Sequence, residues 1–178
     1  MDRIAVIGRS GGGKSTLARG LGAKLGLPVV HLDVLYWLPN WVASEPKPFR
    51  EKLITALAEP RWITDGNFMD TADLHIAGAQ MVVWVDQPRG LCIRRALWRI
   101  VTERGGKRAD MAVGCDEKFD PDFLAYIWNW DRNTRPKVEG AIARFAADKP
   151  LVRLTSDAEI ARFLAGELPS PSVAPTSP

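Results

Sequence analysis

A glycine-rich segment directly after a short apolar run is the feature that most constrains the fold of this 178-residue chain. Residues 8–16 read GRSGGGKST, which matches the pattern G-x-x-x-x-G-K-[ST], and residues 4–7 before them read IAVI. Residues 17–25 continue with leucines at helical spacing. A strand that ends at such a loop and continues as a helix directs unpaired backbone N–H groups at one point. The pattern predicts a site for the phosphates of a nucleoside triphosphate.

Each residue type in this loop has a chemical reason to be there. The glycines lack the Cβ atoms that would keep the chain from wrapping closely around phosphates; they are Gly8, Gly11, Gly12 and Gly13. Lys14 is expected to reach the β- and γ-phosphates, and the Ser15 hydroxyl is expected to ligate Mg²⁺. Thr16 completes the nucleotide-binding segment. The predicted cofactors are therefore ATP and Mg²⁺.

Short β-rich runs alternate with helical patterns along the chain, which predicts an α/β fold with a parallel sheet between two layers of helices. The five runs are residues 3–7, 28–33, 61–65, 81–86 and 151–155. The helical patterns cover residues 49–58, 88–104, 120–130, 136–145 and 157–165. We expect one domain over residues 1–167 and a disordered Pro/Ser-rich tail over residues 168–178.

Composition excludes several classes of protein. No run of about eighteen apolar residues is present, so we expect no membrane span, and a strand begins too early to leave room for a signal peptide. Cys92 and Cys115 are far apart in sequence, which suits a reducing cytoplasm. The net charge is only +3, but arginine outnumbers lysine two to one, as suits phosphate recognition. We expect a monomer or a homodimer.

Further motifs strengthen the assignment to one class of protein. They are HLDVLYWLPNW (31–41), WITDGN (62–67), VDQP (85–88), RGGKRADMAVGC (104–115) and WNWDRNTRP (128–136). With the glycine loop, they resemble the adenylate-kinase-like branch of the P-loop NTPases, and more narrowly the bacterial "DNA topology modulation protein" family. The resemblance implies the strand order 2-3-1-4-5, an acceptor region at about residues 34–60 and a helical lid at about residues 104–135.

Carboxylates at the carboxyl ends of the predicted strands are candidates for chemistry, because ligands of such sheets bind at that edge. The resemblance implies that Asp65 holds a water on Mg²⁺, and that Asp33 binds the acceptor and takes its proton. Asp86 is explained as the cap of the next helix. The two-residue period of a strand turns His31 to the opposite face from Asp33, so we expect a packed histidine there.

Arginines form the next group of candidates. Arg95 and Arg99 lie four residues apart on one helical face and match arginines that contact the nucleotide in adenylate-kinase-like enzymes. The presumed lid carries Arg104, Lys107 and Arg108, and Arg132 and Arg135 match further lid arginines. Cations that arrive when a lid closes stabilise the charge of a transferred phosphoryl group. We therefore expect Arg99, Arg132 and Arg135 to act with Lys14 and Asp33 in catalysis.

The acceptor region departs from adenylate kinases. Those enzymes carry arginines after the second strand and in the D-G-x-P-R string, whereas this chain has no arginine between Arg19 and Arg50 and reads DGNFM at 65–69. The acceptor is therefore expected to lack a phosphate there. Its predicted contacts are Asp33, Asp65 and Asn67, with Tyr36, Trp37 and Phe68 as walls. Helix packing remains the simpler interpretation of the seven tryptophans, and Cys115 alone cannot hold a zinc ion in the lid.

Three functions are compatible with these observations. The favoured one is a phosphotransferase that moves the γ-phosphoryl group of ATP to a small hydroxyl-bearing acceptor. A nucleoside monophosphate kinase is the second, and the missing arginines argue against it. The third is a nucleotide-regulated DNA-binding or topology-modulating protein, for which the sequence holds no recognisable nucleic-acid-binding motif.

Overall fold

The computed structural model describes residues 1–102, 111–116 and 118–167, and within them a five-stranded parallel sheet forms the centre of the fold. Its strands in spatial order are β2 (Val29–His31), β5 (Trp62–Asp65), β1 (Arg3–Gly8), β6 (Met81–Val85) and β7 (Leu151–Leu154). Numbered along the chain within this sheet, the order is 2-3-1-4-5, which confirms the predicted α/β class and topology.

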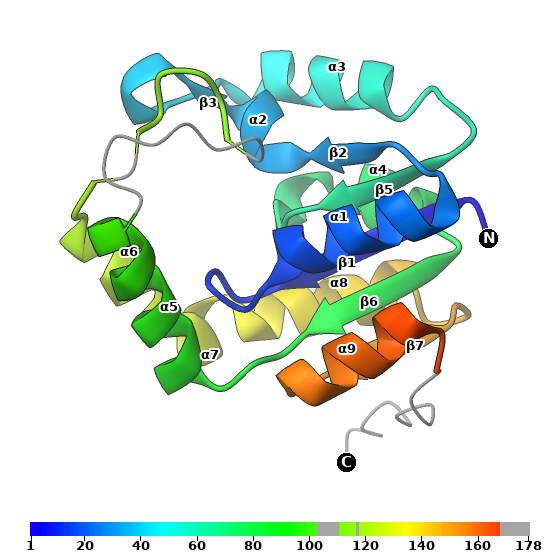
Figure 1. The fold of residues 1–178 in the computed structure, drawn as a ribbon. Helices are drawn as coiled ribbons and strands as arrows, with labels where there is room; N and C mark the ends of the chain where they lie inside the picture. The colour runs from blue at the N-terminus through cyan, green and yellow to red at the C-terminus, as the bar shows by residue number, and fades with distance from the viewer. Residues whose placement is uncertain (103–110, 117, 168–178) are drawn as a thin grey trace.

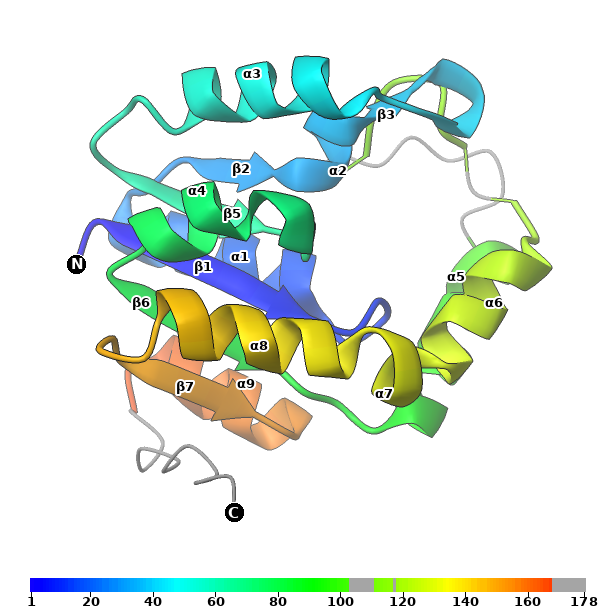
Figure 2. The same cartoon turned by 180° about the vertical axis from the view of Figure 1, so that it is seen from behind.

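Helices cover both faces of the sheet (Figures 1 and 2). Helices α1 (Lys14–Leu25) and α9 (Asp157–Ala165) lie on one face, and α4 (Ala72–Gly78) and α8 (Arg135–Phe145) on the other. Successive side chains of a strand point to opposite faces, so one central strand feeds two cores. In β1, Ile4 and Val6 pack in the core beneath α1 and α9, whereas Ala5 and Ile7 pack in the core beneath α4 and α8.

Two groups of elements extend beyond the carboxyl ends of the strands, on either side of a gap in the ribbon (Figure 1). One group consists of α2 (Leu32–Tyr36) and a small hairpin of β3 (Trp37–Leu38) and β4 (Val42–Ala43), after which α3 (Pro46–Ala56) runs back alongside β2 (Figures 1 and 2). The other consists of α5 (Arg89–Thr102), α6 (Pro121–Trp128) and α7 (Trp130–Asn133). Short 3-10 turns occupy Pro39–Trp41 and Met69–Thr71. We call α5, α6 and α7 the arm.

Most predicted elements are present, with three differences. The second strand ends at His31, because the chain turns into α2 at once and buries Leu32 completely. The predicted helix over 120–130 ends at Trp128 and is followed by the separate short helix α7. Helix α4 was not predicted. The lid residues Arg104, Lys107 and Arg108, and the tail from residue 168, lie outside the described residues.

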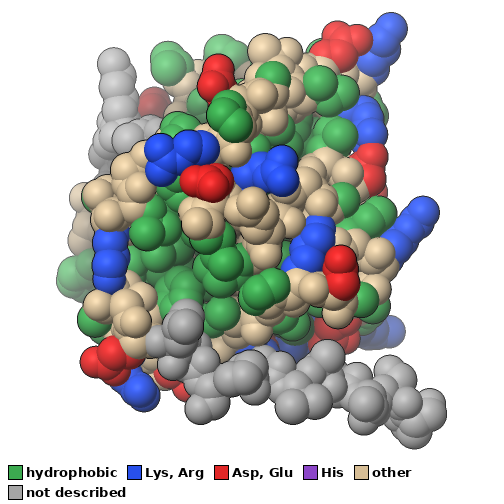
Figure 3. All heavy atoms as spheres, turned by 90° about the vertical axis from the view of Figure 1, so that its right-hand side faces the viewer, with side chains coloured by type: hydrophobic (Ala, Val, Ile, Leu, Met, Phe, Trp, Pro, Cys, Tyr) green, Lys and Arg blue, Asp and Glu red, His purple; other side chains and the backbone are tan. Residues whose placement is uncertain are grey.

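Helix length and surface charge are relevant to two classes considered above, membrane proteins and nucleic-acid-binding proteins. No helix in the described part of the chain has both the length and the apolar character needed to cross a membrane. On the side where the strands begin, opposite the gap, basic and acidic side chains are intermixed rather than separated by sign (Figure 3). Intermixed charges do not make the continuous basic surface that nucleic-acid phosphates require.

Candidate functional site

The glycine loop between β1 and α1 has the conformation that a phosphate cradle needs. Gly11 and Gly13 have φ angles of 79° and 96°, in the region that favours glycine. A Cβ atom at Gly8 would lie 2.0 Å from the carbonyl oxygen of Val85, so no other residue fits there without displacing β6. The capping position of α1 is Gly13, which has no side chain to satisfy the first N–H groups of the helix.

Two side chains hold this loop in place. The Asn67 amide donates to the Gly8 carbonyl oxygen at 2.8 Å, and its oxygen accepts from the Gly8 N–H at 2.9 Å. This reciprocal pair fixes the end of β1 to the segment after β5. The Lys14 ammonium group donates to the carbonyl oxygen of Arg9 at 3.2 Å, across the base of the loop. The structure therefore gives Asn67 a role in supporting the loop in addition to its position at the cleft.

A cleft of about 1150 Å³ opens above the glycine loop, and most predicted site residues line it. Those that do are Gly11, Gly12, Gly13, Lys14, Ser15, Thr16, Asp33, Trp37, Asn67, Phe68, Arg95 and Arg99. Within the described residues, the predicted site residues outside this lining are Gly8, Tyr36, Asp65, Arg132 and Arg135. Gly8 and Asp65 lie at the ends of adjacent strands beneath the cleft. The cleft thus joins the glycine loop to the acceptor region.

One end of the cleft is bounded by α5 and α9. Arg95 donates to Asp157 at 2.6 Å, and the side-chain amide of Gln87 donates to the other carboxylate oxygen of Asp157 at 3.1 Å. Ile160 lies beside Gly13 and also lines the cleft. Sequence reasoning missed Asp157 and Ile160. The signal was available, because residues 156 and 157 follow the last strand at the same edge of the sheet.

Charged side chains converge on Lys14 at the floor of the cleft. Burial lowers the pKa of Lys14 below its ordinary value, and the nearby carboxylates of Asp65 and Asp33 act in the opposite direction. The charge of Arg99 also acts on Lys14 and lowers its pKa further. The guanidinium group of Arg99 lies 5.9 Å from the centre of the Phe123 ring. The charges of Asp65, Asp33 and Arg99 therefore all act on Lys14.

The Ser15 hydroxyl and the Asp65 carboxylate are oxygen donors of the kind that suits a magnesium ion. Asp65 is buried, one of its carboxylate oxygens is joined to His31 Nδ1 at 2.8 Å, and the other has no hydrogen-bond partner among the described residues. Hard oxygen donors such as a hydroxyl and a carboxylate are the ligands that Mg²⁺ prefers. The contact with Asp65 shows that His31 is not simply packed on the strand face opposite to Asp33, as had been predicted. Since β2 and β5 are neighbours in register, His31 lies beside Asp65 and orients it.

Asp33 reaches the cleft from a different element than predicted. It lies in the first turn of α2, two residues beyond the end of β2. Because this turn projects past the edge of the sheet, Asp33 lines the cleft. Trp41, Phe123 and Tyr126 line it as well, and none of the three was among the predicted site residues.

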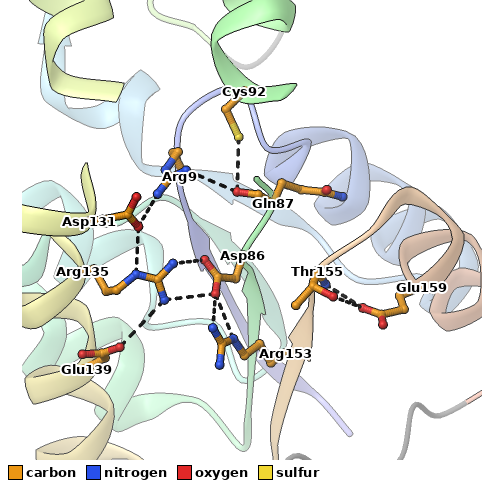
Figure 4. Close-up of polar contacts among 10 residues, drawn as sticks. All are labelled: Arg9, Asp86, Gln87, Cys92, Asp131, Arg135, Glu139, Arg153, Thr155 and Glu159. Carbon is orange, nitrogen blue, oxygen red and sulfur yellow. Dashed lines mark hydrogen bonds and ion pairs between the residues drawn. The ribbon is translucent and has the colours of Figure 1, made fainter. Parts of the chain in front are cut away.

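The arginines at the end of the arm lie differently from the prediction. Arg135, at the start of α8, forms ion pairs with Asp86, Asp131 and Glu139 (Figure 4). Arg132 is exposed on α7. Within the described residues neither lines the cleft. Asp86 also accepts hydrogen bonds from Arg153 (Figure 4). The sequence predicted Asp86 as the cap of the next helix, whereas in the structure it is the acceptor of two arginines, one on α8 and one on β7.

Arg9 was not singled out in the sequence, yet it is one of the largest fully buried side chains, with 2% exposure. It donates to Asp131 on α7 and to the carbonyl oxygen of Gln87 (Figure 4). A buried charge requires a partner, and Asp131 supplies it. Because Asp131 also accepts from Arg135, these side chains connect the glycine loop to the arm and to α8.

This arrangement defines a P-loop NTPase fold of the kinase-like type: a 2-3-1-4-5 parallel sheet, a phosphate loop after its first strand, and an arm beyond its carboxyl edge. No protein-family model matches the chain, and no curated protein matches it either. Solved structures do match. Shikimate kinase from Acinetobacter baumannii aligns over 94% of this chain and 90% of its own, with a TM-score of 0.59 and 15% identity.

Two other kinases have similar folds. A gluconokinase from Sinorhizobium meliloti 1021 aligns over 94% of this chain and 89% of its own, with a TM-score of 0.52 and 15% identity. Deoxyadenosine kinase from M. mycoides with bound dATP aligns over 92% and 95%, with a TM-score of 0.52 and 12% identity. At these identities the likeness establishes the fold, and the reaction has to be argued from the site.

Proposed function

We propose that this chain is a phosphotransferase that moves the γ-phosphoryl group of Mg-ATP to a small hydroxyl-bearing acceptor. The observation that carries the proposal is that one cleft joins the glycine loop and Lys14 to the Asp33 carboxylate and to aromatic side chains. A phosphate cradle and a proton acceptor in one enclosed space are what in-line phosphoryl transfer requires. The kinases with a similar fold support this class of reaction.

The loop side of the cleft binds the nucleotide in this proposal. The backbone N–H groups of residues 11–15 and the Lys14 ammonium group neutralise the phosphates. Ser15 and Asp65, the latter through a water molecule, would hold Mg²⁺, which would supply positive charge that stabilises the phosphates during transfer. Arg95 and Arg99 contact the nucleotide from α5. Arg99 is close enough to Lys14 to act on its pKa, so it contributes charge near the transferred group.

Asp33 is the proposed base. It receives the proton of the acceptor hydroxyl while the oxygen of that hydroxyl attacks the γ-phosphorus. Asp33 lines the same cleft as Lys14, and its charge raises the pKa of Lys14, which supports this role. A base must lie within hydrogen-bond reach of the proton that it takes, and a position between the loop and the aromatic side chains meets that need.

A nucleoside monophosphate kinase would need a cation for the phosphate of its acceptor. Arg50 is the first arginine of the acceptor region, and it pairs with Asp73 at 3.0 Å in an exposed position. It is not among the residues that line the cleft. Arg50 is therefore not placed to bind an acceptor phosphate in the cleft, which leaves Lys118 as the candidate cation for that role.

The resemblance to the "DNA topology modulation protein" family supports one alternative, a nucleotide-regulated protein that binds DNA. The arginines that line the cleft are the groups through which DNA would compete with ATP. Specific DNA binding would instead be independent of ATP and would weaken steeply with salt, because phosphate contacts release counterions.

ADP release from Mg-ATP tests the proposal, with nucleosides, nucleoside monophosphates, sugars and hydroxy acids offered as acceptors. We expect stimulation by one class of acceptor, and a loss of at least about a hundredfold in Lys14→Ala. Lys137→Ala, which removes an exposed lysine on α8, is the matched control and should leave the rate unchanged. If ATP binds but no acceptor accelerates ADP release, a nucleotide-dependent switch replaces the kinase.

A further inference from the structure

Aromatic side chains line the acceptor end of the cleft from both of its sides. Trp37 and Trp41 come from the β3–β4 hairpin, and Phe68 comes from the segment after β5. Phe123 and Tyr126 come from α6, across the gap in the ribbon (Figures 1 and 2). Rings that approach from two sides form a slot, and a slot of this kind suits a flat ligand that stacks on both of its faces.

The rings on the α2 side support one another. Trp37 packs edge-to-face against Trp41 with 5.5 Å between ring centres, and Tyr36 lies 4.9 Å from Trp37 and 4.7 Å from Phe68. Tyr36 thus stands behind the lining rings, where the sequence had suggested a direct wall. A wall that is held in this way loses little conformational entropy when a ligand binds.

The backbone presents two of these rings in an unusual conformation. Within the described residues, the non-glycine residues with positive φ are Asn40, Trp41 and Phe68, and the last two line the cleft. Such a conformation is costly for an aromatic residue and is characteristic of ligand-binding sites. The Asn40 N–H donates to the Gly114 carbonyl oxygen at 2.8 Å, and Trp41 Nε1 donates to that of Asp116 at 2.9 Å. These contacts hold the hairpin in place.

The polar side chains from the same segments are few. In the described part of the segments that carry these rings, the polar side chains that line the cleft are Asp33, Asn67, Lys118 and Asp120. Asn67 is bonded to Gly8, and Asp120 accepts from two N–H groups of its own helix. A sugar would leave several hydroxyl groups without partners here, and the carboxylate of a sugar acid would meet the two carboxylates of Asp33 and Asp120 against the one ammonium group of Lys118. The chemistry of the slot favours an uncharged planar ring.

We propose that the acceptor is a nucleoside, whose base stacks between these rings and whose hydroxyl group reaches Asp33. This inference rests on the proposed phosphotransferase function. A bond forms between the nucleoside hydroxyl oxygen and the γ-phosphorus of ATP, while the bond from that phosphorus to the β–γ bridging oxygen breaks. ADP leaves with the electron pair, the hydroxyl proton passes to Asp33, and the product is a nucleoside monophosphate.

Steady-state kinetics with adenosine, cytidine and thymidine, compared with glucose, gluconate and shikimate, tests the acceptor class. We expect saturable ADP release with at least one nucleoside. Trp37→Leu should raise the KM for that nucleoside at least about fivefold, with kcat and the KM for ATP nearly unchanged, because stacking is lost. Trp37→Phe keeps a ring and should restore the KM. Trp98→Leu, which changes a tryptophan 70% exposed on α5, is the matched control.

The outcomes separate this inference from the function on which it rests. Turnover with sugars, sugar acids or nucleoside monophosphates alone overturns the nucleoside assignment and leaves the phosphotransferase intact. A nucleoside KM that Trp37→Leu does not change also overturns the stacking site. If no acceptor supports turnover, the phosphotransferase fails, and calorimetry decides the site separately. If the wild type binds a nucleoside and Trp37→Leu binds it more weakly, the stacking site is upheld. If the wild type binds no nucleoside, the stacking site is rejected.

Discussion

A buried histidine gives this protein a pH-dependent stability at the scale of a single residue. His75 on α4 is fully buried, and its Nε2 atom lies 3.4 Å from the carbonyl oxygen of Phe68. Burial lowers the pKa of His75 from 6.5 to about 4. Between these values the unfolded chain binds a proton that the folded chain does not. The free energy of unfolding therefore falls as the pH decreases through this window.

Because of His75, we expect the free energy of unfolding to fall by about 2 kcal/mol as the pH is lowered from about 7.5 to about 5. Urea unfolding of the wild type and of His75→Gln at both pH values measures this contribution. The variant is expected to lose less stability on acidification than the wild type, whatever its stability near neutral pH. Equal losses in the two proteins would show that His75 is already protonated in the folded state.

The roles of single residues were most predictable from the sequence where one continuous segment forms the site. The loop over residues 8–16 forms the proposed cradle from its own backbone, so its pattern alone indicated the site. Arg95 and Arg99 were predicted to lie on one helical face, and both line the cleft. Whether a given arginine contacts a phosphate or a carboxylate, however, depends on residues far away in sequence. Arg135 shows this, because Asp86, 49 residues away, engages it.

At the scale of elements, Asp86 joins strand β6 to α8 and β7. Its side chain is 4% exposed and pairs with Arg135 and Arg153, which themselves lie against the Trp84 ring. Removal of a buried partner leaves charges without compensation, which costs more than the loss of an exposed pair. We expect Asp86→Asn to lower the free energy of unfolding by about 2–3 kcal/mol.

The matched control is Asp73→Asn, which breaks the exposed pair with Arg50 and should cost at most about 1 kcal/mol. Urea unfolding of both variants at neutral pH gives the comparison. Similar small losses would mean that the two arginines find water or other partners, and that Asp86 does not hold the three elements together.

Strands and long helices were predictable because their apolar residues are periodic and their ends carry Gly, Pro or capping residues. Gly26, for example, has a φ of 63° at the end of α1. Short elements lack such signals. Helix α2 has five residues and α4 seven, and contacts with the sheet and with α8 decide that they form. The same early turn into α2 shortened the second strand and moved Asp33 into a helix.

At the scale of the whole molecule, the arm and the glycine loop are joined by a pair that no local pattern contains. Arg9 and Asp131 are 122 residues apart in sequence. The arginine is buried and the aspartate is half exposed. Partial burial would raise the pKa of Asp131, but the hydrogen bond from Arg135 and the charge of Arg9 lower it overall. The carboxylate therefore stays ionised and holds the loop and the arm together at neutral pH.

We expect Asp131→Asn to weaken ATP binding about five- to tenfold, because Arg9 then has no full counter-charge and the loop loses its fixed position. Isothermal titration calorimetry with a non-hydrolysable ATP analogue measures the affinity, and hydrogen exchange over residues 9–13 reports the order of the loop. Asp122→Asn on α6 changes an exposed aspartate of the same arm and serves as the control. An unchanged affinity together with slow exchange would mean that Asn67 and Lys14 hold the loop without the arm.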